Sequence, residues 1–181
     1  MERRRFGAAL QGQNLRFTGA GEGGSARARV GFLLLEHFSL PAFTQALDTL
    51  VTANLIRSES FAVSNFSLSG EPVTSDLGLL ICPDLALASA ALQGLDLLVV
   101  CGGLRTPLRS SAALREALQD VASRGVALAG LWNGAWFLGD AGLLDGYRCC
   151  IHPEHRAALA EIARNSQIGR ASCRERVSSP V

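Results

Sequence analysis

Lysine is absent from this sequence of 181 residues, and all seventeen basic residues are arginine. Such a bias indicates a GC-rich bacterial genome, because arginine codons are rich in G and C, and it carries no information about mechanism. A large net charge is also lacking. Seventeen basic residues face sixteen acidic ones, which leaves a formal net charge of +1.

The near-neutral balance hides an uneven distribution of charge. Residues 1–29 hold six arginines against two glutamates, and residues 167–181 hold three arginines against one glutamate. Residues 30–166 hold eight arginines against thirteen acidic residues. A domain that binds nucleic acid presents a basic face to the phosphates. The acidic middle of the chain therefore argues against a nucleic-acid-binding face there.

No apolar run is long enough to cross a membrane, which requires about 20 residues. The longest uncharged apolar run, residues 126–139, is interrupted by Asn133 and three glycines. The N-terminus also lacks the apolar core of a signal peptide. We therefore expect a cytoplasmic protein without a membrane partner.

The cysteines do not form the pattern of a disulfide framework. The five cysteines are Cys82, Cys101, Cys149, Cys150 and Cys173. Their number is odd, two of them are adjacent, and three lie in apolar or strand-like stretches. Reduced thiols fit this pattern better than disulfides.

Hydrophobic residues make up 48% of the chain, which is enough for the core of one ordinary domain. Residues 1–28 lie outside that domain, because they are rich in Arg, Gly and Gln and have no apolar period. We interpret them as a disordered basic leader or the product of a misassigned start codon. An arm that binds nucleic acid is the alternative.

Residues 29–166 alternate between apolar strands and amphipathic helices. Strands are expected at residues 30–35, 61–68, 95–101 and 126–131, and a further strand or hairpin arm at 73–82. Those at 30–35, 95–101 and 126–131 are expected to be buried on both faces. Helices are expected at residues 41–56, 114–121, 135–141 and 153–163. This alternation predicts an α/β fold, a three-layer, doubly wound and mostly parallel sheet of the flavodoxin-like type.

The character of the sequence changes at Gln167. Residues 168–177 read IGRASCRERV, which is the translation of a common short-read sequencing adapter. We therefore expect residues 167–181 to be a non-native, adapter-derived tail and the native domain to continue past Ser166. On this interpretation the sheet is C-terminally incomplete in this chain. A genuine basic tail is the alternative.

Two strand ends are rich in glycine, and ligands bind at the carboxyl ends of strands in such sheets. The first is Cys101-Gly102-Gly103, where small residues expose backbone N–H groups. The second is Gly130-Leu131-Trp132-Asn133-Gly134, the frame of a nucleophile elbow. Its central residue is Trp132, and indole has no heteroatom that attacks an acyl carbon.

These segments, with residues 141–146 and Ile151-His152-Pro153, resemble the ThiJ/PfpI (class I glutamine amidotransferase-like) superfamily. Residues 30–35, Leu47-Asp48 and Ala53-Asn54 resemble more closely the sensor half of AraC-type regulators of the GlxA-like group. The resemblance covers residues 29–166. Position by position, Trp132 takes the place of the superfamily's cysteine and His152 keeps its histidine, whereas Glu36 lies near the supporting acid without aligning to it.

The resemblance implies a non-catalytic, ligand-sensing domain of a bacterial transcription regulator. Its partners would be a small-molecule effector, cationic or amino-acid-like, and a second copy in a homodimer. DNA would be bound only through a C-terminal helix-turn-helix half that this chain lacks. No metal or other cofactor is expected. The predicted ligand pocket consists of Gly102, Gly103, Trp132, Asn133, His152 and Glu36.

Several alternatives remain open at this point. The rival function is a cysteine hydrolase, amidase or glyoxalase-like enzyme, for which Cys150 and His152 would form a dyad. Cys149, Cys150, His152 and His155 could suggest a metal site, but their spacing is not that of a zinc site. Trp136 lies four residues after Trp132 and either shares its face, as half of a box for a cation, or packs in the core.

Overall fold

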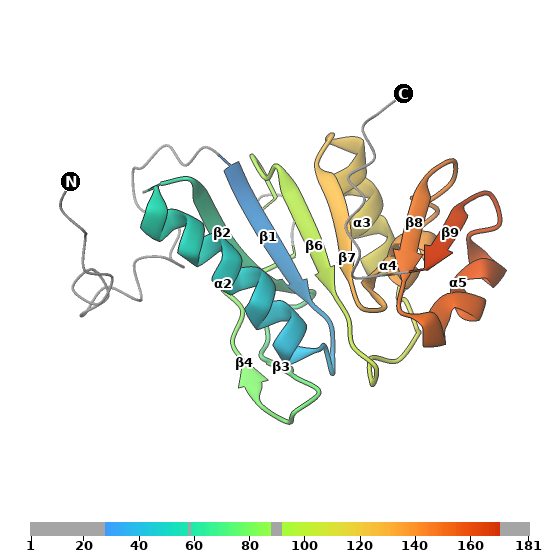
Figure 1. The fold of residues 1–181 in the computed structure, drawn as a ribbon, viewed down its shortest axis with the longest axis horizontal. Coiled ribbons are helices and arrows are strands. Elements are labelled where there is room, and N and C mark those ends of the chain that lie inside the picture. The colour runs from blue at the N-terminus through green and yellow to red at the C-terminus, as the bar shows by residue number, and fades with distance from the viewer. Residues whose placement is uncertain (1–27, 58, 88–91, 171–181) are drawn as a thin grey trace.

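A five-stranded parallel sheet forms the centre of the computed structural model, which describes residues 28–57, 59–87 and 92–170 (Figure 1). Its order is β5-β2-β1-β6-β7. The strands are β1 (Ala28–Leu34), β2 (Phe61–Ser67), β5 (Leu85–Ala86), β6 (Leu97–Cys101) and β7 (Ala127–Leu131).

Two smaller sheets flank the central one. β3 (Val73–Thr74) and β4 (Leu80–Ile81) form an antiparallel hairpin. β8 (Arg148–Ile151) pairs in parallel with β9 (Gln167–Arg170), so the described structure continues past Ser166. The helices are α2 (Leu40–Ile56), α3 (Ala112–Ser123), α4 (Gly134–Asp140), the 3-10 turn η2 (Pro153–His155) and α5 (Arg156–Ile162).

Alternation of side chains along β1 shows why the sheet is covered on both faces. Phe32 and Leu34 belong to one buried cluster, which includes Phe43 of α2. Leu33 belongs to the other cluster, together with Leu118 of α3 and residues of α4. Successive side chains of a strand point to opposite faces, so a continuous apolar strand needs a helical layer on each side. The predicted three-layer α/β fold is confirmed.

The hydrophobic pattern predicted β7 as a strand buried on both faces, and this was wrong. β7 forms, but Ala127 and Gly130 are exposed and the remaining residues are only half-buried. The physical reason is its position, since among the described residues β7 pairs with β6 alone and ends the sheet order. An apolar run does not distinguish a central strand from an edge strand.

The boundaries of the domain differ slightly from those expected from the sequence. β1 begins at Ala28 and pairs there with Phe61. The expected leader otherwise falls on residues 1–27, which lie outside the described residues, as do residues 171–181 of the tail. In the described part of the chain, no helix is both long and apolar enough to cross a membrane.

Candidate functional site

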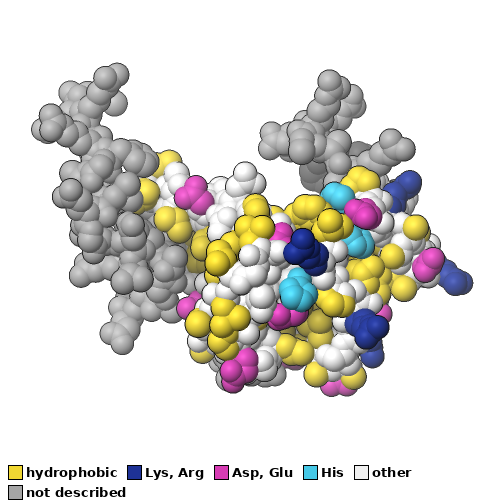
Figure 2. Space-filling view, turned by 90° about the horizontal axis from the view of Figure 1, so that it is seen from below, with side chains coloured by type: hydrophobic (Ala, Val, Ile, Leu, Met, Phe, Trp, Pro, Cys, Tyr) yellow, Lys and Arg dark blue, Asp and Glu magenta, His cyan; other side chains and the backbone are white. Residues whose placement is uncertain are grey.

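The carboxyl ends of three neighbouring strands meet in one row. Leu34 of β1 pairs with Cys101 of β6, which pairs with Leu131 of β7. The segments that leave this row are residues 36–39, 102–106 and 132–134. Figure 2 views the molecule from this edge, where histidine side chains lie among apolar ones. This is the edge at which open α/β sheets bind ligands.

The elbow after β7 has the predicted strand–turn–helix geometry. Trp132 adopts φ = 56°, and α4 begins two residues later at Gly134. A Cβ on Gly130 would lie 2.4 Å from the backbone nitrogen of Ala135, and one on Gly134 would lie 2.1 Å from the carbonyl oxygen of Val100. The turn is therefore closed too tightly for any side chain at either glycine. A left-handed conformation costs a non-glycine residue about 1–2 kcal/mol, which the surrounding packing must offset.

The ring of Trp132 stacks on the ring of His152 across two different strand ends. Their centroids are 4.3 Å apart and the rings are inclined by only 16°. Both residues are half-buried. Nδ1 of His152 accepts a weak hydrogen bond from the backbone N–H of Glu154 at 3.4 Å, which leaves Nε2 to carry the proton in the neutral ring. The stack joins the elbow to the end of β8, and we call the stacked pair of Trp132 and His152 the aromatic platform.

Gly102 and Asn133 are packed tightly against each other at the same edge. A Cβ on Gly102 would lie 1.9 Å from Oδ1 of Asn133. Asn133 is fully buried and donates from Nδ2 to the carbonyl oxygen of Thr106 at 3.3 Å. Oδ1 of Asn133 and Oγ1 of Thr106 are buried without a hydrogen-bond partner. The sequence drew no attention to Thr106, because its proximity to Asn133 arises only from the fold.

Gly103 supports the loop that follows β1. A Cβ there would lie 2.6 Å from both the carbonyl oxygen of His37 and the backbone nitrogen of Ser39. His37 adopts φ = 58°, and its N–H donates to the carbonyl oxygen of Thr74 at 2.7 Å. Glu36 lies at the same edge with its side chain exposed. Gly102 and Gly103 thus both allow neighbouring loops to approach closely.

None of the described cysteines lies at the elbow. Cys101 is buried, and burial raises the pKa of its thiol far above the ordinary value, so the nucleophilic thiolate is suppressed. Cys150 is exposed and Cys149 packs partly against the core. Across residues 28–57, 59–87 and 92–170, no three His, Cys, Asp or Glu side chains are grouped so that they could hold a metal ion.

Trp136 does not share the platform with Trp132. It is 9% exposed, belongs to the larger core cluster and contacts Phe137 edge-to-face at 5.1 Å. The turn at Trp132 is not helical, so the spacing of four residues does not place both indoles on one face. The partner of Trp132 is His152 instead, twenty residues away in the sequence.

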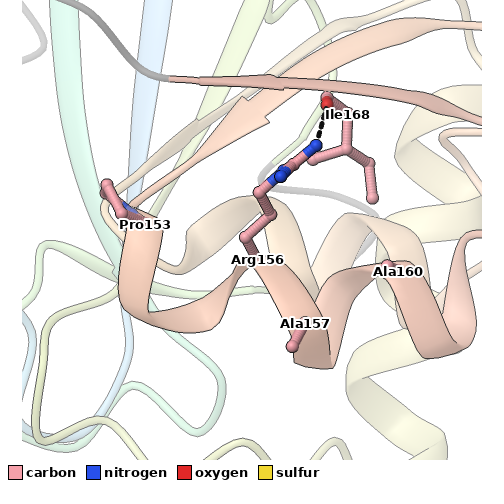
Figure 3. Close-up of a pocket in the computed structure, with 5 residues that line it drawn as sticks. All are labelled: Pro153, Arg156, Ala157, Ala160 and Ile168. Carbon is pink, nitrogen blue, oxygen red and sulfur yellow. Dashed lines mark hydrogen bonds between the residues drawn. The ribbon is translucent and has the colours of Figure 1, made fainter.

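Two recesses lie beside the elbow rather than at it. One, of about 780 Å³, runs along the free edge of β7 and is lined by residues 127–130, Leu138 and residues 142–145 and 147–150. The other, of about 470 Å³, is lined by Pro153, Arg156, Ala157, Ala160 and Ile168 (Figure 3). Arg156 donates there to the carbonyl oxygen of Ile168 at 3.4 Å. Neither recess includes any of the six residues predicted as the ligand pocket, although the fold brings all six to the carboxyl edge of the sheet.

The fold and its elbow define a class, the α/β domains of the glutamine-amidotransferase-like type. Within that class the chain belongs to the DJ-1/PfpI family, whose model matches residues 30–175. The resemblance inferred from the sequence is thereby confirmed.

Several curated relatives are transcription regulators. The HTH-type transcriptional regulator GbdR of Pseudomonas aeruginosa is 36% identical over 133 residues, which cover 73% of this chain and 36% of that protein. The HTH-type transcriptional regulator GlxA of Rhizobium meliloti is 32% identical over 135 residues, which cover 74% and 41%. The chain thus spans less than half the length of these relatives.

Solved structures agree with this assignment. The crystal structure of an AraC family transcriptional regulator from Pseudomonas putida matches with a TM-score of 0.75 at 57% identity, over 78% of this chain and 76% of that one. Drosophila melanogaster DJ-1beta matches with a TM-score of 0.66 at 22% identity, over 80% and 75%, and supports the fold alone.

Proposed function

We propose that this domain is the non-catalytic, effector-binding part of a DNA-binding transcription regulator, and that the effector binds at the elbow. The observation that carries the proposal is Trp132 in the left-handed turn after β7. The turn presents the side chain that would have to attack a substrate. Because indole cannot form an acyl intermediate, the same geometry can bind a molecule but cannot transform it by covalent catalysis.

The chemistry of the platform favours a cationic or amino-acid-like effector. A cation within about 6 Å of an indole face is attracted by the ring quadrupole, by about 0.5–1 kcal/mol at exposed sites and more when it is desolvated. Trp132 is half-buried and held flat against His152, so its orientation is fixed before a ligand arrives. Gly102, Gly103 and Asn133 form the base of the site, and Glu36 offers a carboxylate at its rim.

We infer the remaining partners from the relatives. Their names describe HTH-type regulators, so DNA would be contacted by a helix-turn-helix half outside this chain. A homodimer and a cytoplasmic location are consistent with such a protein. Residues 29–166 would then be an incomplete sensing domain, and the free edge of β7 supports this. We keep the proposal that residues 167–181 are an adapter-derived tail, although β9 pairs with β8 and Ile168 packs against the larger core cluster.

Calorimetric titration with choline and with arginine tests the effector class. We expect one of them to bind, and we expect choline, if it is the ligand, to bind about five- to tenfold more tightly than its uncharged carbon isostere, the equivalent of ~1 kcal/mol. Trp132→Ala should abolish that preference. Tyr147→Ala, which removes an aromatic side chain that is 67% exposed elsewhere, should leave it unchanged.

Two outcomes would reject the proposal. Equal binding of the cation by Trp132→Ala would move the site away from the elbow. Turnover of an amide, peptide or α-ketoaldehyde that is lost in Cys150→Ser but kept in Trp132→Ala would establish the cysteine enzyme as the function.

A further inference from the structure

His152 covers one face of the indole of Trp132. The ring centroids are 4.3 Å apart and the rings are inclined by 16°, so the imidazole lies nearly flat on the indole. A cation that binds an aromatic ring lies over the face of that ring. An effector that stacks on Trp132 must therefore use the face opposite His152, with the indole between the effector and the imidazole.

The charge of His152 changes what the indole offers to such an effector. Histidine is the side chain whose ordinary change of charge falls between about pH 5 and 8. The neutral ring of His152 accepts a hydrogen bond at Nδ1 from the N–H of Glu154 at 3.4 Å and leaves the indole free to attract a cation. A protonated ring is itself a cation on the indole, and it repels a second positive charge on the opposite face.

No ion pair cancels a positive charge on His152 in the part of the chain that the structure describes. The ion pairs there are Arg115–Asp140 and Arg124–Asp120, and neither includes His152. The elbow, residues 132–134, has no ionisable side chain. The ionisable side chains of the neighbouring loops at this edge are Glu36, His37 and Arg105. Those near His152 in its own segment are Cys150, Glu154, His155 and Arg156, of which the ring of His155 is centred 6.4 Å from that of His152.

We propose that His152 determines the charge that the elbow site accepts, because its neutral form admits a cationic effector and its protonated form excludes one. The proposal rests on the proposed function, since it takes Trp132 as the surface on which the effector binds. His152 is then a specificity-determining residue, and effector binding depends on pH. Linkage is reciprocal, so a bound cation should in turn drive protons off His152.

Calorimetric titration of the 181-residue protein with choline and with arginine, at about pH 8 and at about pH 5, tests the proposal. We expect the cation that binds to lose affinity about three- to tenfold at the lower pH, because a like charge lies across the indole. Binding should also release protons, which makes the heat of binding depend on the ionisation enthalpy of the buffer.

Two substitutions of His152 isolate its charge. His152→Phe keeps a flat ring on the indole, and His152→Gln keeps a polar side chain. Both should remove most of the loss of affinity and the release of protons. Glu36 and Glu154 remain in both variants, so their own titration does not account for the difference. His155→Gln is the matched control, because it removes the neighbouring imidazole and leaves the stack, and it should behave like the parent protein.

The fluorescence of Trp132 reports on the stack in the absence of an effector. A protonated imidazole stacked on an indole quenches its emission, so emission should fall on acidification in the parent protein and in His155→Gln. It should stay constant in both His152 variants. Trp136, the second tryptophan, is buried in the core and adds a constant background. Circular dichroism melts should show that all variants fold.

The outcomes separate this proposal from the proposed function. An affinity that changes equally with pH in the parent protein and in folded His152 variants would overturn the role of His152 and leave the effector site at the elbow. Emission that responds equally to pH in the parent protein and in those variants would do the same. Binding of neither cation at either pH would reject the cationic effector itself, and the role of His152 would fail with it.

Discussion

Positions 102 and 134, at the elbow, accept only glycine without strain, because a Cβ at either position would overlap a neighbouring atom. The Cβ of an alanine at position 134 would meet the carbonyl oxygen of Val100, a backbone atom, at 2.1 Å. At position 102 it would meet Oδ1 of Asn133, the end of a side chain, at 1.9 Å. The shorter distance is to Oδ1 of Asn133, which can move by rotation of the side chain, whereas the carbonyl oxygen of Val100 is fixed in β6. The loss of stability on substitution by alanine should therefore depend on how easily the neighbouring atom moves, and not on the distance alone.

We expect Gly102→Ala to lower the free energy of unfolding by about 1–3 kcal/mol, the usual cost of overpacking. Gly134→Ala should cost more, because relief requires movement of β6 or α4 rather than rotation of one amide. Urea denaturation of both variants and the parent protein measures the difference. Equal losses, or a larger loss for Gly102→Ala, would show that the elbow relaxes more freely than its geometry suggests.

The partner of Trp132 also illustrates what sequence can and cannot reveal about the site. The Gly-x-Trp-x-Gly spacing identified the elbow, since that turn needs small residues at fixed positions. The stack on His152 follows from the position of β8, which no local pattern encodes. Helical spacing alone leaves Trp136 either beside Trp132 or in the core. The positive φ of Trp132 interrupts the helical spacing, and Trp136 lies in the core.

At the scale of elements, one side chain fixes the helix α2 to the strand that follows it. Nδ2 of Asn54 donates to the carbonyl oxygen of Phe61 at 2.8 Å, and the N–H of Phe61 donates to Oδ1 of Asn54 at 2.9 Å. Asn54 is 7% exposed. The side-chain amide of Asn54 thus forms the same pair of hydrogen bonds with Phe61 that a backbone peptide group of a neighbouring strand would form.

Asn54→Ala should lower the free energy of unfolding by about 2–4 kcal/mol, because two partly buried backbone groups lose their partners and each costs about 1–3 kcal/mol. Thr49→Ala on the same helix is the control. It removes only an exposed bond from Oγ1 to the carbonyl oxygen of Gln45 and should change stability by less than about 0.5 kcal/mol. Thermal melts of the two variants provide the comparison, and similar melting temperatures would mean that the Asn54 bonds contribute nothing net.

The elements themselves were largely predictable. Strands and helices follow from apolar periodicity, and the elements expected between residues 30 and 163 are present with two changes. Residues 73–82 form the two short strands of the β3–β4 hairpin rather than one strand, and the last helix is divided into η2 and α5. Burial of β7 was not predictable, because an alternation of apolar and small residues is the same whether or not a neighbouring strand exists. The weak sequence signal for the short strand β9 was also missed, since four residues give no usable period.

At the scale of the whole molecule, the main anomaly is that β7 has one edge with no pairing strand in the part of the chain that the structure describes. An uncharged edge strand beside an apolar recess of about 780 Å³ offers unpaired backbone groups to any extended segment. Proteins usually shield such an edge with charged residues, with proline or with a covering element, and Ala127–Leu131 contains neither a charged residue nor a proline. An additional strand from a longer native chain would provide a covering element.

Sequencing the genomic locus from an adapter-free amplicon tests the central claim, that this is the sensing domain of a longer regulator, most directly. We expect the native codons to depart from those of residues 167–181 and to continue through the rest of the sheet into a pair of helix-turn-helix motifs. Finding the present codons for residues 167–181, followed by a stop codon, would contradict the account.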